Sequence, residues 1–183
     1  ETMGLRGLPI SEVRLDNCEA KEVLGGEPGA GYGQLDRMLK MGAVGIVSLS
    51  VGIGTACMEK ATLHAKSRKA FGRQIGKYQE VGFKLADMFT GNDLGRMLGL
   101  RAAWAMNRSE AEADILGSCA KLFATESTTN IANLAMQIFA GHGYIKGADI
   151  ERLYRDAKFG EICEGPSEIQ RTIIAKNELD KFA

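Results

Sequence analysis

The run QLDRMLKMGAVGIVSLSVGIGTACMEKATLHAKS, residues 34–67, repeats one spacing from end to end. Its apolar and small residues fall three and four positions apart, which is the spacing of one face of an α-helix. They are Leu35, Leu39, Gly42, Ile46, Leu49, Ile53 and Ala56. We therefore predict a single long helix over residues 34–67.

The centre of this helix, residues 41–58, lacks charged residues and is long enough to resemble a membrane span. It is rich in glycine and serine, however, and Lys40 and Glu59 lie immediately at its two ends. These features favour the central helix of a folded bundle. We expect no membrane span.

Helical spacing continues after an interruption at residues 68–76. It predicts a second helix over residues 78–107, a third over residues 110–140 and a short one over residues 150–159. A last helix should begin at Ser167, where Ser167 and Gln170 match a Ser-x-x-Gln capping box behind Pro166. Three long helices and a split fourth predict a mainly α fold, an antiparallel up-down bundle of the four-helix type.

The N-terminal part follows a different pattern. Val13 and Leu15 alternate with charged residues over residues 11–16, as in a half-buried strand, but a lone strand needs hydrogen-bonding partners. The glycine-rich residues 25–33 then mark a junction and lack the ending of a phosphate-binding loop. We predict that residues 1–27 are the end of a β-domain and residues 28–183 the helical bundle domain. Because the chain opens with Glu1 and runs into a strand-like segment, we expect it to be part of a longer polypeptide.

Composition narrows the range of functions. Lysine and arginine (23) balance aspartate and glutamate (23), so no overall field favours binding to nucleic acid or to an anionic bilayer. The four cysteines are widely spaced and form no metal-binding or disulfide pattern, which indicates reduced thiols in a cytosol-like compartment. We predict no metal site. The first residues show no secretory signal.

Near the C-terminus, the sequence places one carboxylate in a Gly-Pro turn just before a helix. A glutamate at a helix start often only complements the helix dipole. Here Glu164 lies within a long ordered string, which favours a positioned base. The string is Arg155-Asp156-Ala157-Lys158 followed by Ile162-Cys163-Glu164-Gly165-Pro166-Ser167-Glu168-Ile169-Gln170-Arg171.

This string resembles the C-terminal signature of the acyl-CoA dehydrogenase family, in which a glutamate in a Tyr-Glu-Gly-Thr-Ser-like turn removes the α-proton of an acyl-CoA thioester. The resemblance covers almost the whole chain. It includes Arg68-Lys69-Ala70-Phe71-Gly72, Gln79 and Leu85-Ala86-Asp87-Met88, and Gln137-Ile138-Phe139-Ala140-Gly141-His142-Gly143-Tyr144, which is similar to the family's Gln-x-x-Gly-Gly-x-Gly-Tyr.

The resemblance implies an FAD-dependent acyl-CoA dehydrogenase of fatty acid metabolism, with Glu164 as the catalytic base. It further implies a homotetramer that shares FAD between subunits, electron-transfer flavoprotein as electron acceptor, and a cytoplasmic location, or the mitochondrial matrix in a eukaryote. The remaining site residues that it implies are Arg68, Phe71, Gln79, Gln137, Gly141, Pro166 and Glu168 for the cofactor, and Gly165 and Cys163 for the substrate.

Some positions depart from the family pattern. Ala43 replaces an arginine that helps to hold the substrate, Pro166 replaces a threonine that bonds the flavin, and Ala140 replaces the first glycine of a pair. Relatives that use a different glutamate carry it on the first bundle helix, where residues 41–45 here have no carboxylate. These departures leave open an enoyl-CoA reductase of the same superfamily or a non-catalytic oligomerisation bundle. Without a visible partner, neither His64 nor His142 is expected to be catalytic.

Overall fold

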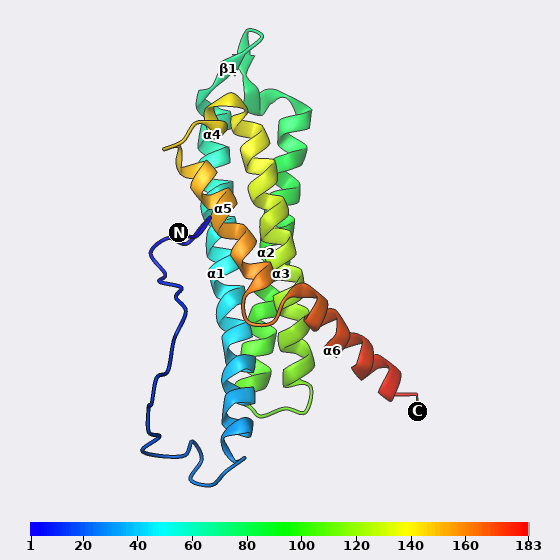
Figure 1. Cartoon of the computed structure of the whole chain (residues 1–183). Helices are drawn as coiled ribbons and strands as arrows, with labels where there is room; N and C mark the ends of the chain where they lie inside the picture. Colours follow the sequence, from blue (N-terminus) through cyan, green and yellow to red (C-terminus); the bar gives the residue numbers. More distant parts are fainter. Residues whose placement is uncertain (183) are drawn as a thin grey trace.

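The computed structural model describes residues 1–182 and confirms the mainly α bundle. Its body consists of three long antiparallel helices, α1 (Gly31–Ser67), α2 (Gln79–Asn107) and α3 (Ala113–Phe139) (Figure 1). A small antiparallel hairpin, β1 (Lys69–Ala70) and β2 (Arg73–Gln74), and the 3-10 turn η1 (Ile75–Lys77) connect α1 to α2. The short α4 (Gly141–Tyr144), α5 (Asp149–Ile162) and α6 (Ser167–Asp180) complete the chain.

The predicted first helix is confirmed, but the large apolar residues do not form its buried face. Leu35, Leu39 and Leu49 are exposed. The buried stripe consists mostly of small residues, which let α2 and α3 approach α1 closely. It runs through Ala43, Val47, Ser50, Ile53, Gly54, Cys57, Ala61 and Ala65, and Ile53 is the one large residue of the predicted face that is buried.

By length and composition alone, α1 is long and apolar enough to cross a membrane, and 39% of its most apolar stretch is buried inside the structure. The core helix of a folded bundle passes the same test. We assign α1 as a core helix of the bundle because it packs against α2, α3 and α5.

The split fourth helix is also confirmed. The first half, α5, packs against α3 and α1 through its buried Ile150, Leu153 and Ala157. The chain then turns at residues 163–166, and α6 leaves the bundle at an angle while keeping contact with α3 (Figure 1). The turn between α5 and α6 therefore lies against the long helices.

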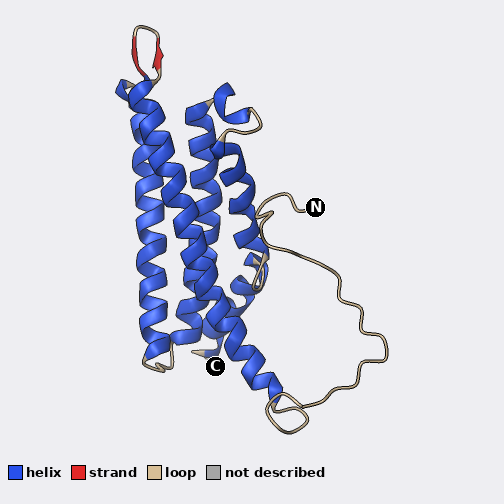
Figure 2. Cartoon of the chain, turned by 90° about the vertical axis from the view of Figure 1, so that its left-hand side faces the viewer, coloured by secondary structure: helices blue, strands red, loops and turns tan. Residues whose placement is uncertain are grey.

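The predicted strand over residues 11–16 is wrong. Residues 1–30 contain no helix or strand, and they run outside the bundle (Figure 2). Val13 and Leu15 are 82% and 77% exposed, because no neighbouring strand is present to pair with this segment. The assignment of residues 1–27 to a β-domain stays a prediction.

The first few residues nevertheless dock on α5. The Leu5 amide donates a 2.6 Å hydrogen bond to Oδ1 of the buried Asp156, and the Arg155 guanidinium donates to the Met3 carbonyl. Gly4 lies so close to α5 that a Cβ there would be 2.6 Å from the Arg155 carbonyl oxygen. Asp156 therefore joins the N-terminal residues to the bundle.

Candidate functional site

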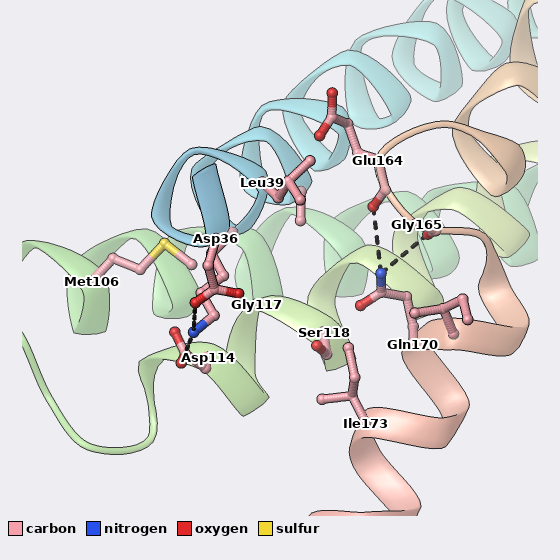
Figure 3. A pocket seen from close by; sticks show the side chains of 13 residues that line it. Asp36, Leu39, Met106, Asp114, Gly117, Ser118, Glu164, Gly165, Gln170 and Ile173 are labelled. Carbon is pink, nitrogen blue, oxygen red and sulfur yellow. Dashed lines mark hydrogen bonds and ion pairs between the residues drawn. The ribbon is translucent and has the colours of Figure 1, made fainter. Parts of the chain in front are cut away.

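The turn between α5 and α6 presents Glu164 in an unusual backbone conformation. Glu164 has φ of 52° and Gly165 has φ of 81°, both in the left-handed region that residues with a side chain rarely adopt. The Gln170 side-chain amide donates to the carbonyl oxygens of Glu164 at 3.4 Å and Gly165 at 3.1 Å (Figure 3). A strained residue fixed by surrounding hydrogen bonds is typical of functional sites.

The carboxylate of Glu164 lies against α1 at Gly42. A Cβ placed on Gly42 would be 2.6 Å from Oε2 of Glu164 and 2.9 Å from its carboxyl carbon. Any side chain at position 42 would therefore displace the carboxylate. The structure thus identifies Glu164 as the group that packs directly on Gly42.

Glu164 and Gly165 line a cavity of about 200 Å³ between α1, α3 and α6 (Figure 3). At one end, Lys40 forms ion pairs with Asp36 at 2.7 Å and Asp114 at 2.6 Å. The hydrogen bonds that Lys40 donates to Asp114 and Asp36 raise the pKa of Lys40. The remaining lining residues are mainly apolar or small: Leu39, Ala43, Met106, Gly117, Ser118, Ile169, Gln170 and Ile173.

A buried lysine, which sequence reasoning missed, supports this turn from α3. Lys121 is 1% exposed, and its Nζ donates a 2.5 Å hydrogen bond to the Gly165 carbonyl oxygen. Burial lowers the pKa of Lys121, although nearby acidic groups oppose this shift. No local pattern identifies such a residue, because its partner lies on a distant part of the chain.

The predicted capping box at α6 is wrong. Pro166 occupies the N-cap position and makes no side-chain capping bond, while Gln170 bonds to the turn at residues 164–165 instead. The first turns of α6 are held to α3 by a two-pronged ion pair, in which both Arg171 amino groups lie 2.7 Å from the Glu126 carboxylate oxygens. This ion pair lowers the pKa of Glu126.

Other predicted residues of this turn occupy its edges. Cys163 ends α5, where its amide donates to the Phe159 carbonyl oxygen, and it does not line the cavity. Pro166 and Glu168 are exposed at the start of α6. Their assignment to the cofactor, and that of Gly165 and Cys163 to the substrate, stay predictions.

A second cavity, of about 540 Å³, lies at the hairpin end of the bundle. It brings together three of the predicted cofactor residues, Arg68, Phe71 and Gln137, from the end of α1, the hairpin and the end of α3. Phe71 is 96% exposed, with φ of 51°, at the tip of the hairpin. Gln79 and Gly141 do not line this cavity.

Two histidines also line the second cavity. The His64 ring stacks on Phe139 with centroids 4.3 Å apart, and its centroid lies 5.9 Å from that of His142. Burial, followed by the nearby His142, lowers the pKa of His64. Neither histidine lines the cavity of Glu164. The expectation that neither is catalytic stays a prediction.

The two glycines after α3 differ in their surroundings, and the assignment of Gly141 to the cofactor stays a prediction. A Cβ on Gly141 would meet open space. A Cβ on Gly143 would lie within 3 Å of Met136, Ile150 and Phe139, so Gly143 is required for packing. Ala140, which precedes them, has φ of 51° and ψ of −137°, a conformation suited to glycine.

The two cavities share no lining residue: the first includes the turn between α5 and α6, and the second lies at the hairpin end of the bundle. One holds a carboxylate against apolar walls and can accept a proton from a bound molecule. The other offers a guanidinium, an exposed aromatic ring and an amide. Among residues 1–182, no cluster of histidine, cysteine and acidic side chains could hold a metal ion, and all four cysteines are free thiols.

Comparisons with known proteins agree with this geometry. Residues 29–179 match the family model described as acyl-CoA dehydrogenase, C-terminal domain. The chain is 41% identical over 180 residues to the 3-(aryl)acrylate reductase of Clostridium sporogenes, covering 98% of this chain and 48% of the relative. It is 38% identical over 183 residues to the mitochondrial short-chain specific acyl-CoA dehydrogenase of Sus scrofa, covering all of this chain and 44% of the relative.

Among solved structures, butyryl-CoA dehydrogenase from Megasphaera elsdenii superimposes with a TM-score of 0.81 at 31% identity. The match covers 84% of this chain and 40% of the other. The chain thus spans a little less than half the length of the relatives that it matches.

Proposed function

Because this chain belongs to the acyl-CoA dehydrogenase family, whose C-terminal domain it contains, we propose that it supplies the base for FAD-dependent α,β-dehydrogenation of an acyl-CoA thioester. The observation that carries the proposal is the position of Glu164. Its carboxylate lies against Gly42. The turn that carries it is fixed by hydrogen bonds from the Lys121 and Gln170 side chains to the Gly165 carbonyl oxygen. No other carboxylate lies on α1 beside Gly42, among residues 41–45.

In this reaction, Glu164 takes the α-proton of the thioester and becomes a carboxylic acid. The electron pair left at Cα forms the double bond as hydride leaves Cβ. FAD, when bound, supplies the acceptor for that hydride. Glu164 needs a fixed position because proton abstraction and hydride loss occur at neighbouring carbons of the same substrate.

The residues of the second cavity fit part of FAD. Arg68 can bind a pyrophosphate through two parallel hydrogen bonds, and Phe71 presents a free ring face on which an aromatic group can stack. Gln137 adds an amide donor and acceptor at the same cavity. We assign these three residues to the cofactor, with Gln79 and Gly141 as flanking positions.

We further propose that FAD is shared between subunits of a homotetramer. The separation of the two cavities supports this, because the Glu164 side and the Arg68 side share no lining residue. A row of large apolar residues on α2 also supports association, since each is 50–60% exposed. These are Phe83, Phe89, Leu94, Met97, Leu100 and Trp104.

The substrate class is an acyl-CoA, and the electron acceptor that we propose is electron-transfer flavoprotein. The enzyme would act in the cytoplasm, or in the mitochondrial matrix of a eukaryote. One relative is named as a reductase, which favours testing the reverse reaction, reduction of an enoyl-CoA, as a second candidate.

The first test is an anaerobic visible spectrum of the natural full-length polypeptide with FAD, recorded before and after a panel of saturated acyl-CoA esters. Bleaching of bound flavin by one ester supports dehydrogenation and identifies the substrate. Reoxidation of reduced flavin by enoyl-CoA esters alone supports the reductase. Retention of no flavin, together with self-association, supports a non-catalytic bundle and contradicts the proposal.

A further inference from the structure

Lys121 is the largest fully buried side chain among residues 1–182. It lies in the N-terminal third of α3 and contacts the turn that carries Glu164. Its Nζ donates a 2.5 Å hydrogen bond to the Gly165 carbonyl oxygen, which also accepts the Gln170 amide at 3.1 Å. Two donors from two helices therefore fix a single peptide group, the one between Gly165 and Pro166 in the turn that carries the proposed base.

This arrangement constrains the backbone of Glu164 itself. Glu164 and Gly165 both have left-handed φ values, and such a conformation persists only when its surroundings fix it. Gln170 belongs to α6, which leaves the bundle, whereas Lys121 belongs to the core of α3. Lys121 therefore links the turn to the packed helices of the bundle. These helices include α1, and the Glu164 carboxylate lies against Gly42 of α1.

Stability does not explain a lysine at this position. An ammonium group loses its hydration on burial, and the lowered pKa of Lys121 reflects that loss. The acidic residues Glu161, Glu164 and Glu168 offset it only in part. Apolar residues of similar volume often replace buried charges with no loss of stability. A buried charged donor that fixes a strained turn has the character of a functional residue.

We propose that Lys121 is a positioning residue for Glu164: its buried ammonium group holds the Gly165 carbonyl so that the carboxylate stays beside Gly42. The inference rests on the proposed function of Glu164 as the base. Lys121 does not touch the substrate in this account. It acts through the backbone of the turn.

The test compares Lys121→Met with the wild type in the natural full-length, flavin-loaded polypeptide. Methionine keeps most of the volume and removes the donor and the charge. We expect kcat for acyl-CoA to fall about 10- to 100-fold, because small misplacements of a reacting group have effects of this size. KM should stay within about twofold, flavin retention should not change, and the melting temperature should stay the same or rise.

Thr128→Val is the matched control on α3. Thr128 is also buried, and its hydroxyl donates a 3.0 Å hydrogen bond to the Ser50 carbonyl oxygen, away from the turn. This variant should lose stability and keep kcat. Loss of stability in K121M with unchanged kcat would show a merely structural lysine and overturn the inference.

A second variant covers the case in which K121M does not fold. Lys121→Arg keeps a cation and N–H donors, so its kcat should be closer to the wild type than that of any folded variant without a donor. A K121R enzyme that folds, holds flavin and still loses about 10-fold or more of kcat contradicts the inference. If the wild type itself exchanges no α-proton, the proposed function of Glu164 is wrong. That result differs from one in which the wild type is active and only the role of Lys121 is contradicted.

Discussion

Replacing Gly42 with alanine should move the Glu164 carboxylate without lowering the stability of the bundle. The new Cβ would lie 2.6 Å from Oε2 and 2.9 Å from the carboxyl carbon of Glu164. Both atoms belong to the far end of a flexible side chain, so the carboxylate moves and the helices stay in place. Alanine is also the better helix former, by about 1 kcal/mol in a helix interior.

The variant should therefore be slightly more stable and much less active. A gain of about 1 kcal/mol corresponds to a rise of about 2–4 °C in melting temperature for a chain of this size. Displacement of the base by about 1 Å lowers the rate by about 100-fold. Differential scanning calorimetry measures the first effect, and exchange of the substrate α-proton with deuterated solvent measures the second.

Gly45→Ala is the matched control for Gly42→Ala. Gly45 lies on the same helix, and a Cβ there meets no atom within 4 Å. This control should show the gain in stability with normal proton exchange. If Gly42→Ala also exchanges the α-proton at the wild-type rate, the carboxylate is not used where the structure places it, and the reasoning fails.

Three further predictions concern the fold. Ala140→Gly should raise the melting temperature by about 2–4 °C. The backbone conformation of Ala140 costs about 1–3 kcal/mol, and relief of this strain outweighs the entropy that the more flexible glycine loses on folding. Asp156→Ala should speed hydrogen exchange at the Leu5 amide by about 10- to 100-fold, since that amide loses its buried acceptor, and two-dimensional NMR measures the rate. Arg171→Gln should destabilise the chain at neutral pH, because Arg171 lowers the pKa of Glu126 in the folded state. That stabilisation is present above the ordinary carboxyl pKa of 4.5 and is lost as pH falls through the lowered value, so urea titrations of variant and wild type should converge in acid.

The sequence predicts most of the helices because helical spacing is a local property. It does not predict which face of α1 is buried, since close packing selected the stripe of Ala43, Ser50 and Cys57 over the larger Leu35 and Leu39. Alternation over residues 11–16 predicts a strand, but pairing depends on a neighbouring strand that these residues lack.

The candidate site, like the fold, can be predicted from the sequence only in part. The ordered string around Glu164 predicts a base. The family motifs point to Arg68, Phe71 and Gln137, which the fold brings to one cavity. Lys121 has no sequence signature, because its role depends on contact with Gly165 from another helix. The capping box fails for a related reason: the side chain of Gln170 bonds to the preceding turn instead of the start of its own helix.

The measurement that tests the central claim most directly is α-proton exchange by Glu164→Gln in the natural flavin-loaded polypeptide. Glutamine has nearly the same size as glutamate, so the turn, Gly42 and the bound flavin should be undisturbed. We predict that the variant retains FAD and binds acyl-CoA while exchange of the α-proton into deuterated solvent falls to the background rate. Exchange at the wild-type rate would show that another residue is the base.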